Sequence, residues 1–297
     1  MSSQKRNKLN LLLLNWPPHT VATYHWLEKQ GISRQLAQNY VASHWLERIG
    51  RGAFARADSA VDWKGGLYPL QQEPKGLIYI AGKTALELQG FGHFLPLGHQ
   101  RPIWLFGPLG QKLPQWFKKR WGQEIKYVMT DFLGEEGITA QDQGGYSLRI
   151  SSPERAILEV LYFVPNSQSF EEAKLLMEGL ATLQPQAMQH LLQGCTSIKV
   201  KRLALVLAEY FRHGWLQELD LSKITLGKGK RSLEKSGFLH SKYQITLPER
   251  LGGVVTRLEC KSMPVIPAKA GIQESDVGKT LASRLRGNDK GGASVIS

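Results

Sequence analysis

Proline and glycine divide the first 65 residues into short segments, and this punctuation constrains the fold more than any other feature of the chain. The leucine-rich run at 4–14 predicts a helix that ends before Pro17, because proline lacks an amide donor and disfavours helix in the residue before it. We expect a second helix to begin at a Thr20 cap and to end at Gly31, where glycine adopts a left-handed C-cap at little cost. A third helix is expected to begin at Ser33.

The third helix is predicted to have two unlike faces. With about 100° between successive residues, an apolar face collects Leu36, Ala37, Tyr40, Val41 and His44. The opposite face is polar, and together with the cap it supplies the expected DNA contacts, which are Ser33, Arg34, Gln35, Gln38 and Asn39. Arginine pairs with guanine, and glutamine or asparagine with adenine, in the major groove. Any solvated helix face has a similar composition, so the segment that follows decides the interpretation.

That segment predicts a β-hairpin, with two short strands around Gly50-Arg51-Gly52. A hairpin directly after the third helix is the wing of a winged helix-turn-helix. Its arginines, Arg48, Arg51 and Arg56, are expected to meet phosphates or enter the minor groove, contacts that set register rather than sequence choice. The alternative is a hairpin with ordinary surface arginines.

The distribution of charge supports a polyanionic partner. The formal net charge is +13, and residues 1–65 hold nine Lys and Arg against four Asp and Glu. The middle, 66–198, is nearly neutral, whereas 199–262 holds thirteen basic and six acidic residues. Two basic blocks therefore flank a neutral centre, and this pattern favours nucleic acid as the partner. The second block contains further candidate nucleic-acid contacts, namely Lys228, Lys230, Arg231 and Lys235.

Beyond a linker expected at 66–76, which is rich in glycine and proline, the chain predicts a larger domain at 77–262. Strands are expected at 78–81, 103–106, 125–129, 146–150 and 243–247, with a helix at 83–89 between the first two. Further helices are expected after the cap Ser152 and at 169–183, 185–192 and 199–213. Strands that come first and helices that come later predict an α+β fold.

The sequence offers no catalytic, cofactor or metal site. Its two cysteines are 65 positions apart, its eight histidines form no pair at ligand spacing, and Gly278-Lys279-Thr280 lacks the upstream glycine of a phosphate-binding loop. The leucine run near the N-terminus is too short for a signal peptide, and no stretch approaches the ~20 apolar residues of a membrane span. We therefore expect a cytoplasmic protein that is not an enzyme and does not contact a membrane.

Four segments together resemble the AbiEi-type antitoxins. They are RIGRGAF at 48–54, YIAGKTALELQG at 79–90, SPERAILE at 152–159 and YQITLP at 243–248, and the resemblance extends over roughly residues 4–260. The tail at 263–297 departs from it, resembles a translated bacterial interspersed DNA repeat, and is expected to be mobile.

The resemblance implies a type IV toxin-antitoxin system. In this family the winged helix represses its own operon, so the implied partner is operator DNA in the promoter, with inverted repeats. The C-terminal domain is implied to counteract a nucleotidyltransferase-like toxin without a stable complex. No catalytic residue carries over. Ser152, Glu154 and Arg155 match a family motif, but we expect them to act structurally, as a helix cap, a charge at the helix dipole and a packing or ion-pair arginine.

Two other functions are compatible with the residues. One is a transcription factor whose C-terminal domain senses a ligand or drives oligomerisation, and the other is an enzyme that the winged helix directs to nucleic acid. The second basic block could extend the DNA footprint, bind the RNA substrate of a toxin, or form a solvated loop.

Overall fold

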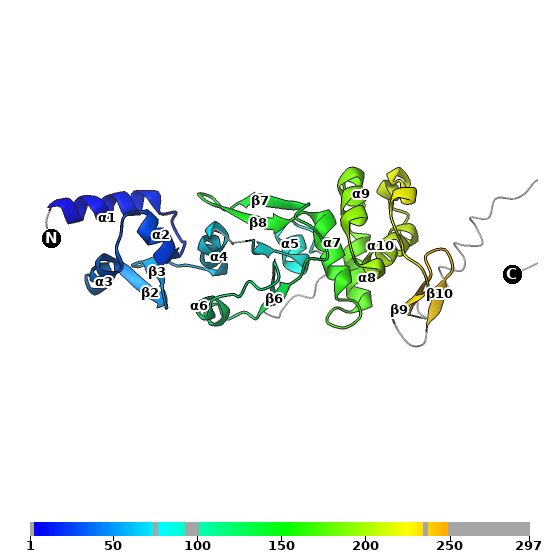
Figure 1. The fold of residues 1–297 in the computed structure, drawn as a ribbon, viewed down its shortest axis with the longest axis horizontal. Helices are drawn as coiled ribbons and strands as arrows, with labels where there is room; N and C mark the ends of the chain where they lie inside the picture. Colours follow the sequence, from blue (N-terminus) through cyan, green and yellow to red (C-terminus); the bar gives the residue numbers. More distant parts are fainter. Residues whose placement is uncertain (1–2, 74–76, 93–100, 234–236, 249–297) are drawn as a thin grey trace, which may run out of the picture.

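Three helices and a three-stranded sheet form an N-terminal unit at 3–56, and this confirms the winged helix-turn-helix (Figure 1). The computed structural model describes residues 3–73, 77–92, 101–233 and 237–248. The helices are α1 (Ser3–Asn15), α2 (Tyr24–Lys29) and α3 (Arg34–Ala42). The antiparallel sheet has the order β1-β3-β2, built from β1 (Ala22–Thr23), β2 (Leu46–Gly50) and β3 (Ala53–Arg56).

The caps of these helices confirm two expectations and correct a third. The Ser33 hydroxyl accepts the amide of Leu36 at 3.2 Å, and Gly31 has the left-handed φ of 73°. Thr23, not Thr20, caps α2 by accepting the amide of Trp26. The helix begins later than expected because residues 22–23 pair with β3 as a strand.

His44 does not lie on the apolar face of α3. It follows the helix, has a φ of 56° and is exposed, so the expectation that it lies on this face was wrong. Two of the other residues expected on that face, Ala37 and Tyr40, are fully buried.

The segment expected to be a linker is largely helical. Helix α4 (Trp63–Gln72) begins at Asp62, whose carboxylate accepts the amide of Gly65, and its Leu67 and Leu70 belong to the larger hydrophobic core. Gly65 and Gly66 lie inside the helix. Gly65 lies against the carbonyl of His19 and Gly66 against the ring of Trp121, so a side chain at either position would collide with these groups.

The second unit, residues 63–248, has a five-stranded mixed sheet at its centre, with the order β6-β5-β4-β8-β7. Its strands are β4 (Tyr79–Ile80), β5 (Ile103–Gly107), β6 (Ile125–Met129), β7 (Ile138–Asp142) and β8 (Ser147–Ser151). Neighbours β5 and β6 are parallel, as are β4 and β8, whereas β4 with β5 and β7 with β8 are antiparallel. Four of these strands were predicted from the sequence, and β7 was not.

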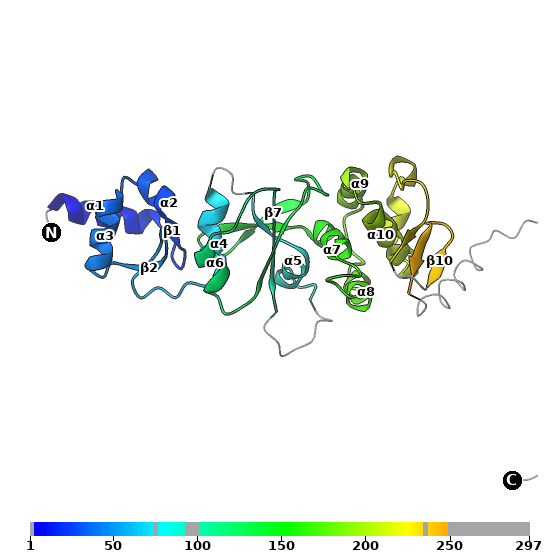
Figure 2. The ribbon, with the colours of Figure 1, turned by 60° about the horizontal axis from the view of Figure 1, so that its bottom comes forward.

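Helices lie on both sides of this sheet along the long axis of the molecule (Figures 1 and 2). Helices α4 and α6 (Gln115–Lys119) face the N-terminal unit, and α5 (Gly82–Leu88) packs on α7. On the far side lie α7 (Pro153–Tyr162), α8 (Phe170–Glu178), α9 (Pro185–Gly194) and α10 (Ile198–Tyr210). The α+β expectation is confirmed, although α8 ends five residues earlier than expected, at Glu178.

Two 3-10 turns and a small sheet complete the described chain. The turns are Gly214–Glu218 and Leu221–Lys223, and the sheet has the order β10-β11-β9, from β9 (Arg231–Ser232), β10 (Phe238–His240) and β11 (Ile245–Leu247). Within the described ranges, no helix is both long enough and apolar enough to cross a bilayer. The tail expected to be mobile, 263–297, lies outside the described residues.

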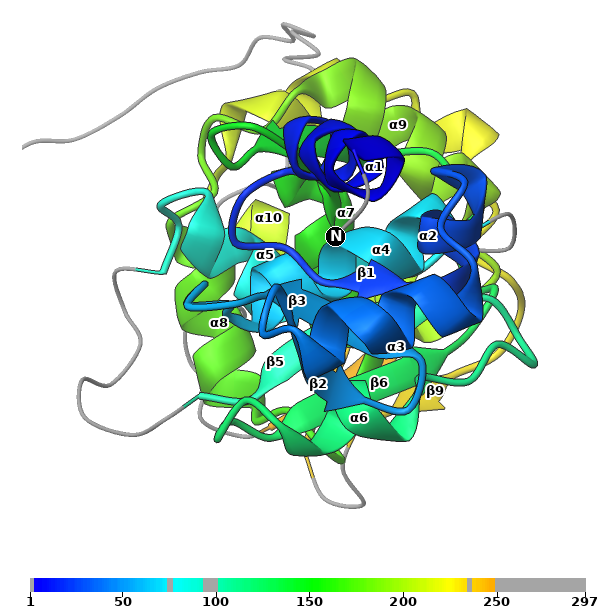
Figure 3. The ribbon, with the colours of Figure 1, turned by 90° about the vertical axis from the view of Figure 1, so that its left-hand side faces the viewer.

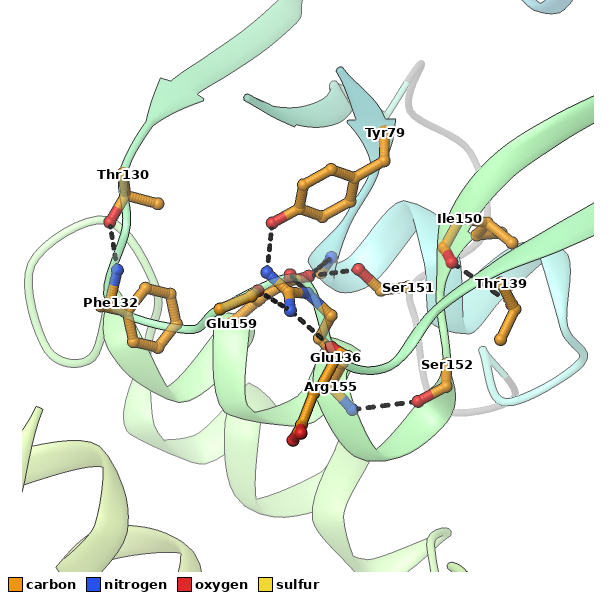
Figure 4. Close-up of polar contacts among 12 residues, drawn as sticks. Tyr79, Thr130, Phe132, Glu136, Thr139, Ile150, Ser151, Ser152, Arg155 and Glu159 are labelled. Carbon is orange, nitrogen blue, oxygen red and sulfur yellow. Dashed lines mark hydrogen bonds and ion pairs between the residues drawn. The ribbon is translucent and has the colours of Figure 1, made fainter. Parts of the chain in front are cut away.

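A buried ion pair within α7 is hydrogen-bonded to the sheet (Figure 4). Arg155 Nε donates to Glu159 at 2.8 Å, and the two side chains are 2% and 0% exposed. The other carboxylate oxygen of Glu159 accepts the amide of Gly82 and the hydroxyl of Ser151, both at 2.8 Å. Burial raises the pKa of Glu159, and Arg155 with these hydrogen bonds opposes that rise.

Residues of the matched motif make structural contacts of the kind expected from the sequence. Ser152 accepts the amide of Arg155 and caps α7, whereas the Glu154 carboxylate accepts the amide of Gln184 at 2.9 Å. Arg155 also donates to the hydroxyl of Tyr79 at 2.7 Å and to the carbonyls of Gly134 and Glu136 at 2.6 Å.

Removing one partner of the pair is expected to destabilise the protein strongly. Arg155→Met leaves Glu159 buried without its cation, so the free energy of unfolding should fall by about 3–5 kcal/mol. Lys242→Met, which breaks an exposed pair with Glu209, should cost less than about 1 kcal/mol. Urea titration of each variant measures both effects.

The double variant Arg155→Met/Glu159→Gln separates charge from packing. Glutamine keeps an acceptor for Gly82 and Ser151 but carries no charge, so this variant should be more stable than Arg155→Met alone. If the double variant is no more stable, an uncompensated carboxylate is not the cause of the loss.

Candidate nucleic-acid interface

The polar face of α3 is free to approach DNA. The side chains of Arg34, Gln35 and Asn39 are exposed, and Ala37 and Tyr40 on the other side are buried. The Ser33 hydroxyl is engaged in the cap. Helix α1 lies on a different side of the unit, as the views in Figures 1 and 3 show, so it leaves this face open.

Gln38 connects α3 to the wing. Its amide Nε2 donates to the hydroxyl of Tyr24 at 2.6 Å, and its Oε1 accepts Arg48 Nη2, also at 2.6 Å. Arg34 lies over the ring of the same tyrosine, 5.2 Å from its centroid, and pairs with Glu28 at 3.2 Å. The half-buried Gln38 amide therefore fixes the angle between helix and wing, and it reaches a base only by exchanging these bonds.

The tip of the wing packs against the second unit. Gly50 lies against Trp116 of α6 so closely that any side chain would collide with the indole. Glu47 of β2 pairs with Arg120 at 3.4 Å. Arg51 is exposed but lines a space of about 650 Å³ between the two units. The wing is thus braced by the second unit and does not project alone.

Arg56 points inward. Its guanidinium donates to the carbonyls of Leu13, at 2.7 Å, and Trp16, and it lies over the Trp16 ring at 5.8 Å. Burial lowers the pKa of this arginine. Arg56 therefore ties the wing to the end of α1, and of the three wing arginines only Arg48 and Arg51 are presented to a ligand.

The structure adds a basic group that the sequence analysis missed. Lys118, Lys119 and Arg120 are exposed at the end of α6, next to the wing tip. The sequence around them had no predicted element, so the run gave no sign of its position beside the wing. These cations extend the charged surface from the N-terminal unit onto the second.

The second basic block forms a loop held from inside by a buried arginine. Arg202, 2% exposed, donates to the carbonyls of Leu226, Gly227, Gly229 and Gln244 at 2.6–3.1 Å. Burial, and then the charge of Arg231, lower the pKa of Arg202. Lys228, Lys230 and Arg231 are exposed on this loop, whereas Lys235 lies outside the described residues.

No group of three His, Cys, Asp or Glu side chains stands together to hold a metal in the described part of the chain. Both basic surfaces instead present side chains suited to contact phosphates. The arrangement supports binding to a polyanion.

Comparison with known proteins agrees with this arrangement. Residues 5–97 match the family described as "Transcriptional regulator, AbiEi antitoxin N-terminal domain", and residues 100–248 match "Transcriptional regulator, AbiEi antitoxin, Type IV TA system". The fold is similar to the crystal structure of the RV2827C protein from Mycobacterium tuberculosis, with a TM-score of 0.53 and 17% identity, over 88% of this chain and 96% of that one. No curated protein matches the chain.

Substitutions on α3 and on the wing are expected to differ in kind. Gln35→Ala or Asn39→Ala should relax base preference, because these amides can read base edges. Arg51→Ala should weaken binding to every sequence and reduce the slope of log affinity against log salt by about 1. Fluorescence anisotropy with operator and random duplexes measures both quantities.

Asn10→Ala is the matched control, because this exposed side chain lies on α1. It should bind both duplexes like the unmodified protein. Equal losses on operator and random DNA for all three interface variants would contradict the division into reading and anchoring residues.

Proposed function

The chain belongs to the AbiEi antitoxin family of transcriptional regulators, and from this premise we propose that it represses its own toxin-antitoxin operon by binding inverted repeats in the promoter. In this proposal the protein acts in the cytoplasm. Helix α3 reads the bases of the operator, and the wing and α6 contact its phosphates. We further propose that residues 77–262 counteract a nucleotidyltransferase-like toxin without forming a stable complex.

The observation that carries the DNA-binding proposal is the exposed polar face of α3 beside a braced wing. Three side chains able to contact bases or phosphates, Arg34, Gln35 and Asn39, share that face, and the Gln38 bridge fixes the helix relative to the hairpin. Exposed cations on the wing and on α6 continue the surface. Such preorganisation lowers the entropic cost of binding.

We propose that the basic loop at 226–231 adds a second, sequence-independent contact. Arg202 binds the inward carbonyls of the loop, and this leaves three exposed cations outside. In Figure 1 the loop strand β9 lies at the far end of the molecule from α3, so one chain can touch DNA at two separated places. Such contacts contribute salt-dependent affinity and no base preference.

Antagonism of the toxin is expected not to need the DNA-binding surface of α3 and the wing. The full-length chain carrying Gln35→Ala, Asn39→Ala and Arg51→Ala should restore growth when co-expressed with the product of the adjacent operon gene, toxic by itself. The same variant should fail to repress a reporter driven by the operon promoter. Growth rate and reporter output from one strain measure both properties.

Two results would count against parts of this proposal. Full repression by the triple variant would show that operator binding does not need these side chains of α3 and the wing. Loss of rescue, with the variant folded and abundant, would show that neutralisation requires DNA binding. Pull-down of the toxin with tagged full-length chain should recover none at micromolar concentration if the antagonism needs no stable complex.

A further inference from the structure

A cavity of about 390 Å³ opens beside the buried ion pair in the second unit. It lies beyond the carboxyl ends of the parallel strands β5 and β6, since Gly107 ends β5 and Thr130 follows β6. In open sheets covered by helices, small molecules often bind at the carboxyl ends of the strands. Their sites usually have a volume of about 300–1,000 Å³. The basic surfaces described above are separate from this cavity.

Its inner wall carries a fixed cationic group. Arg155 lines the cavity, and Glu159, Tyr79 and two carbonyls hold its guanidinium in place. Figure 4 shows Thr130 and Tyr79 flanking the space above this arginine. The four bonds use four of the five N–H donors of a guanidinium, so one remains without a partner among the described residues.

A second arginine lines the same wall with donors to spare. Arg149 of β8 makes one side-chain hydrogen bond within the described chain, from Nη2 to the carbonyl of Gln71 at 2.9 Å. Its main chain is separately fixed to the Gln71 amide, at 2.7 and 3.1 Å. Two guanidinium groups with free donors suit one phosphate or carboxylate.

Two carboxylates also line the cavity. Asp131 follows β6, which is three strands away from β8 in the sheet, or about 14 Å at the usual strand spacing of about 4.8 Å. Glu135 is a second exposed carboxylate on the lining, and its charge acts on Arg149; Leu77, Leu133 and Ile138 supply apolar side chains. A ligand that fills the cavity needs an anion at one end, an apolar middle and hydrogen-bond donors at the other.

We propose that this cavity binds a nucleoside monophosphate whose base carries an exocyclic amino group. The phosphate lies against Arg149 and Arg155, the base packs on the apolar wall, and the amino group donates to Asp131. A triphosphate adds more negative charge than a single phosphate to a lining that already holds Asp131 and Glu135, so it should be repelled more strongly. An amino acid is too short, because its ammonium and carboxylate groups are adjacent.

Calorimetric titration of the full-length protein with AMP, GMP, CMP, UMP, ATP, ribose 5-phosphate and inorganic phosphate tests the proposal. At least one of the three amino-bearing monophosphates should bind about tenfold or more tightly than UMP, ATP and ribose 5-phosphate. Absence of binding by all three would overturn the site. Equal binding of ribose 5-phosphate would overturn the role of the base.

Two variants test whether the nucleotide binds in this cavity. Arg149→Met keeps the main-chain bonds to Gln71 and should weaken binding by about tenfold or more, whereas Arg212→Met, an exposed arginine elsewhere, should not. Leu77→Trp, at a rim position that is 42% exposed, should reduce binding by narrowing the space while every charge remains. Unchanged binding in both Arg149→Met and Leu77→Trp would place the nucleotide elsewhere.

Discussion

The buried pair of Arg155 and Glu159 is the contact on which the second unit depends. Glu159 accepts the amide of Gly82 at the start of α5 and the hydroxyl of Ser151 at the end of β8. Arg155 reaches β4 through Tyr79 and the β6–β7 connection through two carbonyls. One helical turn of α7 therefore fixes several elements at once. Such a pair costs desolvation free energy, and these additional bonds are what offset it.

Among the described residues, two further arginines each bind several backbone carbonyls. Arg56 holds the end of α1 against β3, and Arg202 holds the loop at 226–230 against α10. A guanidinium has several donors in a fixed plane, so one side chain can satisfy several carbonyls of an irregular segment. These inward arginines add to the net positive charge, but backbone carbonyls engage them, so they do not belong to the exposed cationic surfaces.

Direct contacts join the two units. Helix α4 continues from the N-terminal unit into the larger core, and the amide of Val21 donates to the carbonyl of Gly65 at 3.0 Å. The wing tip meets Trp116, and Glu47 meets Arg120. The hairpin therefore contacts the second unit as well as α3.

The sequence by itself determined the elements whose signals are local. Proline and glycine positions, the Ser33 and Ser152 caps and the period of the apolar residues predicted the winged helix, four of the five strands of the central sheet and the helical C-terminal half. Tertiary structure decided what these residues contact. In the folded chain, Arg56 bonds to a carbonyl 43 positions away, and Gln38 bonds to both Tyr24 and Arg48. Helix α6, which carries Lys118 and Lys119, lies against the wing. Such contacts depend on how distant segments pack, and no local pattern of residue types encodes that packing.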